Sequence, residues 1–233
     1  MVKLWYFRGV LNFCAVIPCF NHPNSVATVA SRAREYCPVL IVDDGSTFLL
    51  PEVPGCSILR QEENRGKGAA LRAGFQYAVE QGFTHVMTLD ADGQHFAEDL
   101  PKFLAAAREQ SEALVVGVRD FRVSGCPAAR RWSNGVSNFW FRIETGLALG
   151  DSQCGFRCYP LELVRRLKTG SGRFAFELEF MVRAAWGGTP IVTVPVKCIY
   201  ESEQVSRSHF RPVRDFAHIA FMSLGLALQS RRK

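Results

Sequence analysis

The sequence predicts an α/β fold in which helices cover both faces of a mostly parallel sheet. Short runs rich in Val, Ile and Leu alternate along the chain with segments whose apolar residues recur at helical spacing. No internal repeat, low-complexity tract or Pro/Ser/Gly-rich linker interrupts this alternation. Such a pattern is typical of βαβ units, whose crossover helices bury both sides of a parallel sheet.

The predicted strands are short and end in Asp, Gly or Pro. They lie at residues 13–17, 39–42, 56–59, 85–89, 114–118 and 191–200. The predicted helices have apolar residues three and four positions apart. They lie at residues 24–36, 67–80, 96–109 and 174–186.

Composition narrows the class of protein. With 233 residues, 48% of them hydrophobic and 21% charged, the chain is globular, with one large domain or two small ones, and is not intrinsically disordered. The apolar residues 216–228 fall short of the ~18 that a spanning helix needs. Arg8 and Asn12 interrupt the apolar start, so we expect no signal peptide. The net charge of +6 indicates an anionic partner.

The eight cysteines form no CxxC pair, which excludes a zinc knuckle and a thioredoxin-like motif. They are too sparse for a disulfide-stapled secreted scaffold. We therefore expect most of them to be buried thiols in a reducing compartment.

Polar residues follow three of the predicted strands. They are Asn21-His22, Asp43-Asp44-Gly45-Ser46 and Asp90-Ala91-Asp92-Gly93-Gln94-His95. A single Asp after a strand is commonly a turn residue or a helix N-cap. Three such sites at successive strand ends indicate a ligand site instead, because ligands of α/β sheets bind beyond the carboxyl ends of the strands.

Asp90 and Asp92 are the candidate metal ligands, with Gln94 as a third. Side chains two apart in extended backbone share a face, ~6.5 Å apart along the chain. Two such carboxylates repel unless a cation lies between them, and oxygen ligands suit Mg or Mn. The alternative is structural: Asp92-Gly93 forms a turn and Asp90 caps the next helix.

Residues 64–68 join a strand to a helix, as a P-loop does, but Gln61 and Gly68 stand where the motif requires Gly and Ser or Thr. A helix start with Arg65 and Lys67 can still attract a phosphate or a carboxylate. A Gly-rich helix start with solvated bases is the alternative.

Nine short motifs follow one another along the chain. They are VIPCFN (16–21), VDDGST (42–47), NRGKGAALRAGF (64–75), LDADGQH (89–95), VVGVRD (115–120), RRWSNGVSN (130–138), TGLALGDSQCGFRCY (145–159), FELE (176–179) and SHFRPVRDF (208–216). In this order and spacing the chain resembles a family 2 glycosyltransferase of the dolichyl-phosphate-mannose-synthase-like group.

The resemblance implies a GT-A fold, the Rossmann-like fold of nucleotide-diphospho-sugar transferases, a UDP- or GDP-hexose donor and inversion at the sugar carbon. The implied donor-binding residues are Pro18, Asn21, Asp44, Lys67, Asp90 and Asp92, and the implied metal ligands are Asp90, Asp92 and Gln94. The implied catalytic residues are Asp92, Arg119, Arg131 and Asp151. The implied acceptor-binding residues are Arg131, Ser133, Gln153 and Arg211.

Two positions depart from the family pattern. His22 follows Asn21 where the family has Glu, which leaves the preference for the donor base open. Cys154 stands where the family has Ser, and it keeps the size while losing a strong hydrogen-bond donor. A redox-sensitive pair with Cys158 is the alternative, but no activating pattern accompanies it.

The acceptor decides whether the reaction needs a base. A hydroxyl acceptor needs a carboxylate to take its proton, whereas a phosphate monoester, with a second pKa near ~6, is already nucleophilic. We expect polyprenyl phosphate as the acceptor. A hydroxyl on a lipid or glycan is the alternative, with Asp151, Glu177 or Glu179 as the base, although both glutamates are expected on a helix surface. An inactive glycosyltransferase-like subunit is a further alternative.

The expected organisation is an extension over residues 1–12, a GT-A domain over 13–211 and an apolar, basic helix over 212–233. That helix either packs on the domain or lies in a membrane interface. With the basic residues 207–214 before it, we expect peripheral contact at the cytoplasmic face of a membrane, and no nucleic-acid partner. A sugar nucleotidyltransferase would need a Gly- and Arg-containing loop after the first strand, and residues 18–24 contain neither.

Overall fold

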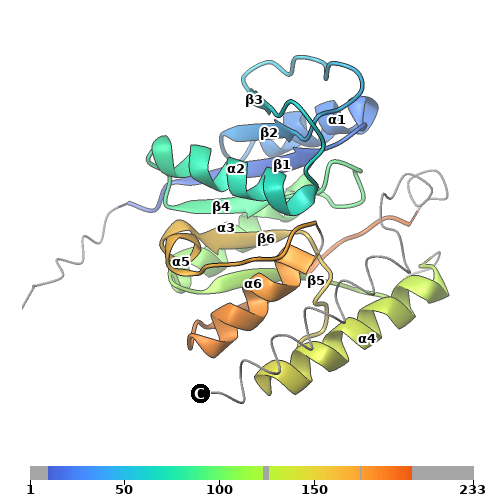
Figure 1. The fold of residues 1–233 in the computed structure, drawn as a ribbon, viewed down its shortest axis with the longest axis vertical. Helices are drawn as coiled ribbons and strands as arrows, with labels where there is room; N and C mark the ends of the chain where they lie inside the picture. Colours follow the sequence, from blue (N-terminus) through green and yellow to red (C-terminus); the bar gives the residue numbers. More distant parts are fainter. Residues whose placement is uncertain (1–9, 123–125, 174, 201–233) are drawn as a thin grey trace, which may run out of the picture.

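Residues 10–122, 126–173 and 175–200 are described in the computed structural model of the chain. Within them, seven strands form one sheet with helices on both sides (Figure 1). In chain order the strands are β1 (Phe13–Cys19), β2 (Val39–Asp43), β3 (Ser57–Arg60), β4 (His85–Thr88), β5 (Leu114–Arg119), β6 (Arg157–Pro160) and β7 (Ile191–Val196). Their order across the sheet is β3-β2-β1-β4-β6-β5-β7.

The sheet is mostly parallel, which confirms the predicted class. β1 lies between β2 and β4, and both pair with it in parallel. β3 extends this half, and β5 pairs with β7, also in parallel. β6 alone of the described strands runs antiparallel, between β4 and β5. The carboxyl ends of β1, β2 and β4 therefore meet at one edge of the sheet.

The six predicted strands are all present, with ends shifted by a few residues. The largest difference is at residues 191–200, where β7 ends at Val196. Beyond it, Cys198 forms only an isolated antiparallel bridge with His95. β6 was not predicted. It has four residues and begins with the charged Arg157, so its apolar run is too short to stand out.

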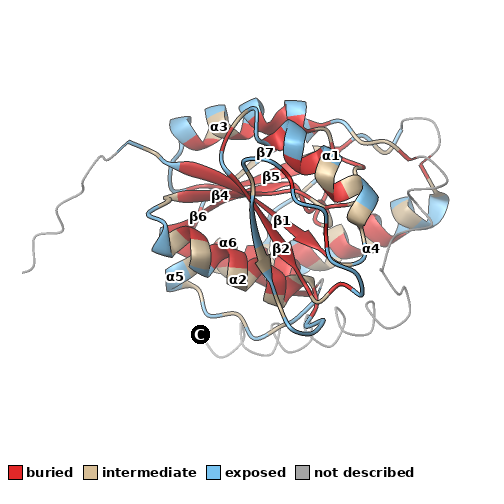
Figure 2. Cartoon of the chain, turned by 90° about the horizontal axis from the view of Figure 1, so that it is seen from above, coloured by how far each residue is buried: buried red, intermediate tan, exposed pale blue. Residues whose placement is uncertain are grey.

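Helices cover both faces of the sheet (Figure 2). They are α1 (Pro23–Ala33), α2 (Lys67–Glu80), α3 (Leu100–Glu109), α4 (Ala128–Thr145), α5 (Leu161–Arg166) and α6 (Ala175–Trp186), with a 3-10 turn, η1 (Ala97–Asp99), before α3. α1 and α3 pack on one face and α2, α5 and α6 on the other, and each face has its own buried apolar cluster. α4 packs against α6, farther from the sheet.

The bounds of α2 agree with the predicted helix, and α1 and α6 differ from their predictions by one to three residues. The predicted helix 96–109 begins instead with η1, and Pro101 stands in the first turn of α3. Neither α4 nor α5 was predicted.

Gly74 allows α2 to lie directly on the sheet. A Cβ at this position would stand 2.5 Å from Cγ1 of Val16 in β1, closer than packed carbons approach. The close packing fixes the start of α2, and with it Lys67, relative to the ends of β1 and β2.

Several expectations fall outside the described residues: residues 1–9 of the extension, Arg211, and the helix over 212–233. All eight cysteines are free thiols, six of them buried, which confirms the expected burial. No helix in the described ranges has the length and apolar character needed to cross a bilayer.

Candidate active site

The loops after β1 and β2 are tied together at the shared edge of the sheet. The backbone N–H of Asn21 donates to Oγ of Ser46, and the N–H of Thr47 donates to Oδ1 of Asn21, each at 2.9 Å. Asn21 has a φ of 57°, in the left-handed region that Asn tolerates better than most residues. The loops after β1 and β2, two of the three polar strand ends, are thus hydrogen-bonded to each other.

The adjacent carboxylates Asp43 and Asp44 have separate partners. Oδ2 of Asp43 accepts from the Arg60 guanidinium at 2.6 Å. Asp44 accepts from the backbone N–H groups of Arg65 and Gly66 at 2.9 and 2.8 Å. Burial nevertheless raises the pKa of Asp44 above its ordinary value. Asp44 thereby holds the loop that leads into α2 against the end of β2.

Lys67, the first residue of α2, bridges two acidic side chains. Its Nζ lies 2.6 Å from Oδ1 of Asp90 and 2.8 Å from Oε2 of Glu177. Gly155 leaves the space that this pair occupies, because a Cβ there would stand 2.5 Å from Oδ2 of Asp90 and 2.6 Å from Nζ of Lys67. Three distant segments therefore meet at Asp90.

The pKa values of the two candidate metal ligands, Asp90 and Asp92, are shifted in opposite directions. Burial alone would raise the pKa of Asp90, but the Lys67 ammonium outweighs it and holds that pKa below its ordinary value. Burial, and then repulsion from Asp90, raise the pKa of Asp92, although Oδ1 of Asp92 accepts the N–H of Gln94 at 3.0 Å. A second cation beside Asp92 would relieve that repulsion.

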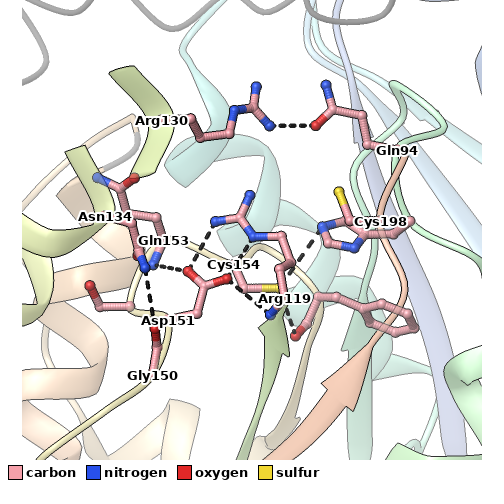
Figure 3. Close-up of polar contacts among 12 residues, drawn as sticks. Gln94, Arg119, Arg130, Asn134, Gly150, Asp151, Gln153, Cys154 and Cys198 are labelled. Carbon is pink, nitrogen blue, oxygen red and sulfur yellow. Dashed lines mark hydrogen bonds and ion pairs between the residues drawn. The ribbon is translucent and has the colours of Figure 1, made fainter. Parts of the chain in front are cut away.

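Arg119 and Asp151 form a buried ion pair at the end of β5 (Figure 3). Two guanidinium nitrogens donate to the two carboxylate oxygens, at 2.6 and 2.9 Å. Asp151 is fully buried, and its Oδ1 also accepts the N–H of Gln153 at 3.1 Å. The pairing fixes the orientation of the Arg119 guanidinium.

The inward face of α4 reaches the same site. Nη1 of Arg130 donates to Oε1 of Gln94 at 2.5 Å, and Figure 3 shows these side chains meeting above the Arg119–Asp151 pair. One turn further on, Oγ of Ser133 accepts from Nε2 of Gln153 at 2.9 Å.

Arg157 anchors the chain below the site. Its guanidinium is buried and donates to the carbonyl oxygens of Cys154 at 2.7 Å, Ser152 at 3.0 Å and Glu177 at 2.7 Å. A single side chain thus joins the loop after α4 to the start of α6.

The expectation that Glu177 and Glu179 lie on a helix surface is wrong. Glu177 is 5% exposed and Glu179 is 3% exposed. Glu177 pairs with Lys67, whereas Glu179 accepts from Nε of Arg183 at 2.6 Å and from the N–H of Ser171 at 2.7 Å. Both oxygens of Glu179 have hydrogen-bond partners, whereas Oε1 of Glu177 is buried without one and only Oε2 meets Lys67.

Cys154 lies in the core beneath Arg119. Its Sγ is 3.9 Å from Nε2 of His95, and burial raises the pKa of its thiol to about 12. Burial also raises the pKa of Cys158. Neither thiol has the activating surroundings that a redox pair requires.

Most of the predicted site residues gather at this edge. They are Asn21, Asp44, Lys67, Asp90, Asp92, Gln94, Arg119, Ser133, Asp151 and Gln153. Pro18 is buried within β1. Arg131 is exposed on α4, and its neighbour Arg130 is the arginine that contacts Gln94.

The side chains that could bind a metal suit a cation that also takes ligands from substrate phosphates and water. Within the described residues, no three His, Cys, Asp or Glu side chains are grouped to hold a metal ion. Asp90 and Asp92 are two carboxylates, and Mg typically takes one or two carboxylates together with substrate phosphates and water. Oε1 of Gln94 already accepts from Arg130, so the carboxylates are the better ligands.

Two residues of the site, Gly155 and Arg157, were missed from the sequence, and a third, Arg130, was passed over in favour of Arg131. Gly155 stands in the motif at 145–159, but its role depends on a contact with Asp90 that only the fold creates. Arg130 has a neighbouring arginine, and the sequence does not distinguish them. Arg157 carries the clearest signal, a charged residue within an otherwise apolar strand.

Two solved structures of sugar-phosphoglycerate synthases share this fold. Glucosyl-3-phosphoglycerate synthase of Mycobacterium tuberculosis, in complex with Mn2+, uridine diphosphate and phosphoglyceric acid, covers 94% of this chain and 78% of its own, at a TM-score of 0.63 and 16% identity. Mannosyl-3-phosphoglycerate synthase of Rubrobacter xylanophilus covers 95% of this chain and 74% of its own, at a TM-score of 0.64 and 16% identity. The fold is therefore GT-A-like.

The family match identifies the class of protein as a glycosyltransferase. Residues 14–167 match the family model described as Glycosyl transferase family 2. The chain belongs to that family, which confirms the resemblance found in its motifs, and it is a transferase of the EC 2.4 class.

Relatives in this family act on lipid phosphates. An undecaprenyl-phosphate mannosyltransferase of Micrococcus luteus is 32% identical over 200 residues, which are 78% of this chain and 81% of that protein. A polyprenol monophosphomannose synthase of Mycolicibacterium smegmatis is 25% identical over 218 residues, 86% of this chain and 82% of that protein.

Proposed function

We propose that this protein is an inverting glycosyltransferase that moves a hexose from UDP- or GDP-hexose to polyprenyl phosphate. The observation that carries the proposal is the state of the acidic groups. Asp90, Asp151 and Glu177 are ion-paired, and Asp44 accepts two backbone N–H groups. Asp92, which accepts the N–H of Gln94, is the remaining carboxylate, and the proposal assigns it to the metal. A hydroxyl acceptor needs a free carboxylate base, and a phosphate acceptor does not. The activities of the named relatives support the same acceptor.

The proposed reaction is a single displacement. An oxygen of the acceptor phosphate forms a bond to the anomeric carbon, and the bond from that carbon to the donor diphosphate breaks with its electron pair. The nucleoside diphosphate leaves with one more negative charge. Stabilising that charge is the main catalytic task.

Most of the predicted residues have a role in this proposal. Asp90 and Asp92 would hold Mg or Mn, and the metal would supply positive charge for the leaving diphosphate. Arg119 faces the phosphates and Asp151 orients it, so Asp151 is a positioning residue. The nucleoside contacts are Pro18, Asn21 and Asp44, and Lys67 holds Asp90. The acceptor phosphate contacts are Ser133, Gln153 and Arg211, together with Arg130, which Gln94 positions. Arg131 lies on the exposed side of α4, so Arg130 takes the place that the sequence assigned to Arg131.

The first experiment tests the donor. Thermal unfolding is followed with UDP- and GDP-hexoses, with and without Mn. We expect one donor to raise the Tm only when Mn is present, and Asp92→Ala to abolish the rise. The matched control is Glu35→Ala, an exposed carboxylate outside the site. No response to any donor would contradict the proposal.

The second experiment tests the acceptor. Radiolabelled donor is offered with polyprenyl phosphate or with polyprenol of the same chain length, which differs only in the phosphate. We expect transfer to the phosphate alone. Transfer to polyprenol, or only to hydroxyl products of a membrane extract, would overturn the proposed acceptor and favour a base such as Glu177.

A further inference from the structure

The amphipathic pattern of α4 is reversed relative to an ordinary surface helix. Its inward face is polar: Ser133, Asn134 and Ser137 are buried. Nδ2 of Asn134 donates to the carbonyl of Gly150 at 3.2 Å, and the hydroxyls of Ser137 and Ser152 lie 2.7 Å apart. Polar contacts, together with the single buried ring of Phe141, attach this helix to the domain.

The outward face of α4 is apolar. Trp132, Phe139 and Ile143 are 68%, 58% and 60% exposed, and their spacing of seven and four residues places them on one side of the helix. Leu147, just past the end of the helix, is 44% exposed. Scattered exposed apolar residues are normal, but a continuous stripe of large ones indicates a binding surface.

The stripe has a basic border. α4 contains three arginines and one glutamate, and both Arg131 and Arg142 are exposed. Their spacing of eleven residues places them along one side of the helix. A helix with aromatic residues on one face and arginines beside them is typical of segments that lie in the interface of an anionic bilayer.

We propose that the outward face of α4, formed by Trp132, Phe139 and Ile143 with Arg131 and Arg142 at its border, docks on an anionic membrane surface. α4 lies on the outside of the molecule, beyond α6 (Figure 1). Its opposite face carries Arg130 and Ser133 into the active site. Docking therefore sets the acceptor side of the site next to the lipid headgroups. The inference rests on the proposed lipid-phosphate acceptor for its function, and the experiment separates the two.

The test measures binding of the full chain to sedimented vesicles of equal parts phosphatidylglycerol and phosphatidylcholine. A second set of vesicles contains phosphatidylcholine alone. We expect the double variant Phe139→Ser/Ile143→Ser to weaken binding to the mixed vesicles at least tenfold. We expect Arg142→Glu to weaken binding only to the vesicles that contain phosphatidylglycerol. The matched control, Phe48→Ser/Leu49→Ser, removes two side chains that are 75% and 79% exposed in another loop and should bind as the wild type does.

Vesicles with brominated acyl chains give an independent measurement. We expect them to quench the tryptophan fluorescence of the wild type more than that of Trp132→Phe. Equal binding by the wild type and the Phe139→Ser/Ile143→Ser variant would overturn the proposal. So would a wild-type dimer that this variant converts to a monomer, since a second copy would then be the occupant. Wild type that binds no vesicles and shows no quenching would also overturn it.

The proposed transfer reaction is assayed separately in detergent micelles with a short polyprenyl phosphate. There we expect the Phe139→Ser/Ile143→Ser variant to keep wild-type activity, because no bilayer is present. Loss of vesicle binding with retained transfer supports docking, and absence of transfer in every variant contradicts the proposed function alone.

Discussion

Arg119 donates through Nε and Nη2 to the two carboxylate oxygens of Asp151, at 2.6 and 2.9 Å, with both side chains almost entirely buried. Asp151 thus has no oxygen left to act as a base. Asp151 therefore affects the reaction by positioning the Arg119 guanidinium. The sequence predicted a catalytic carboxylate at this position, whereas the geometry supports a positioning residue.

Asp151→Asn should impair both folding and activity. The substitution leaves a buried guanidinium without its counter-ion, and breaking a buried pair typically costs about 3–5 kcal/mol. We expect a clear fall in the free energy of unfolding, measured with urea, and a large fall in kcat. The neighbouring pair of Asp120 and Arg122 is exposed, so Asp120→Asn should change neither. A fully stable and active Asp151→Asn variant would refute this role.

Gly155→Ala should damage the site more than the fold. Its Cβ would stand within 2.6 Å of Nζ of Lys67 and closer still to Oδ2 of Asp90, so the ion pair must shift. We expect donor affinity, measured by calorimetry with Mn, to fall at least tenfold. The control is Gly135→Ala, where nothing lies within 4 Å of the new Cβ and the helix should gain about 0.5–1 kcal/mol. Wild-type donor binding in Gly155→Ala would show that Asp90 need not stay in place.

Stability should fall in mild acid because of His85, at the start of β4. Burial lowers the pKa of its ring below the ordinary 6.5, and Nε2 contacts the carbonyl of Ser111 at 2.9 Å. Between the two pKa values the unfolded chain binds the proton that the folded protein rejects. His85 therefore does not reduce the free energy of unfolding above pH 6.5, and it reduces that free energy progressively as the pH falls below 6.5. When thermal unfolding is measured at several pH values below 6.5, the Tm of His85→Gln should fall less with decreasing pH than the Tm of the wild type. Equal pH dependence of the two Tm values would contradict this role of His85.

Thiol reagents should distinguish the cysteines by burial. Cys14, Cys37 and Cys158 are buried, and burial raises the pKa of each thiol, so the thiolate needed for reaction is scarce even at pH 9. Cys56 and Cys198 are partly exposed. We expect Ellman's reagent to label these two first and the other thiols only on denaturation. Rapid labelling of all eight in the folded protein would contradict the core described above.

The elements that sequence reasoning predicted well are those whose inner face is apolar. α2 and the strands on either side of β1 have such faces, and their polar ends identified the site. α4 was missed because its buried face consists of Ser and Asn, and β6 because it is short and opens with Arg157. Individual contacts were beyond prediction for another reason. The pairing of Lys67 with Glu177 joins residues 110 positions apart, and only the packing of α6 on the sheet brings them together.

The buried Arg157 has a consequence for local motion. Its three hydrogen bonds reach carbonyls on both the 152–154 loop and α6, up to 20 residues away in the chain. Neither segment can detach without stranding a charged group in the apolar interior. The loop and the first turn of α6 should therefore open as one cooperative unit, and native-state hydrogen exchange should report a single opening free energy for their amides.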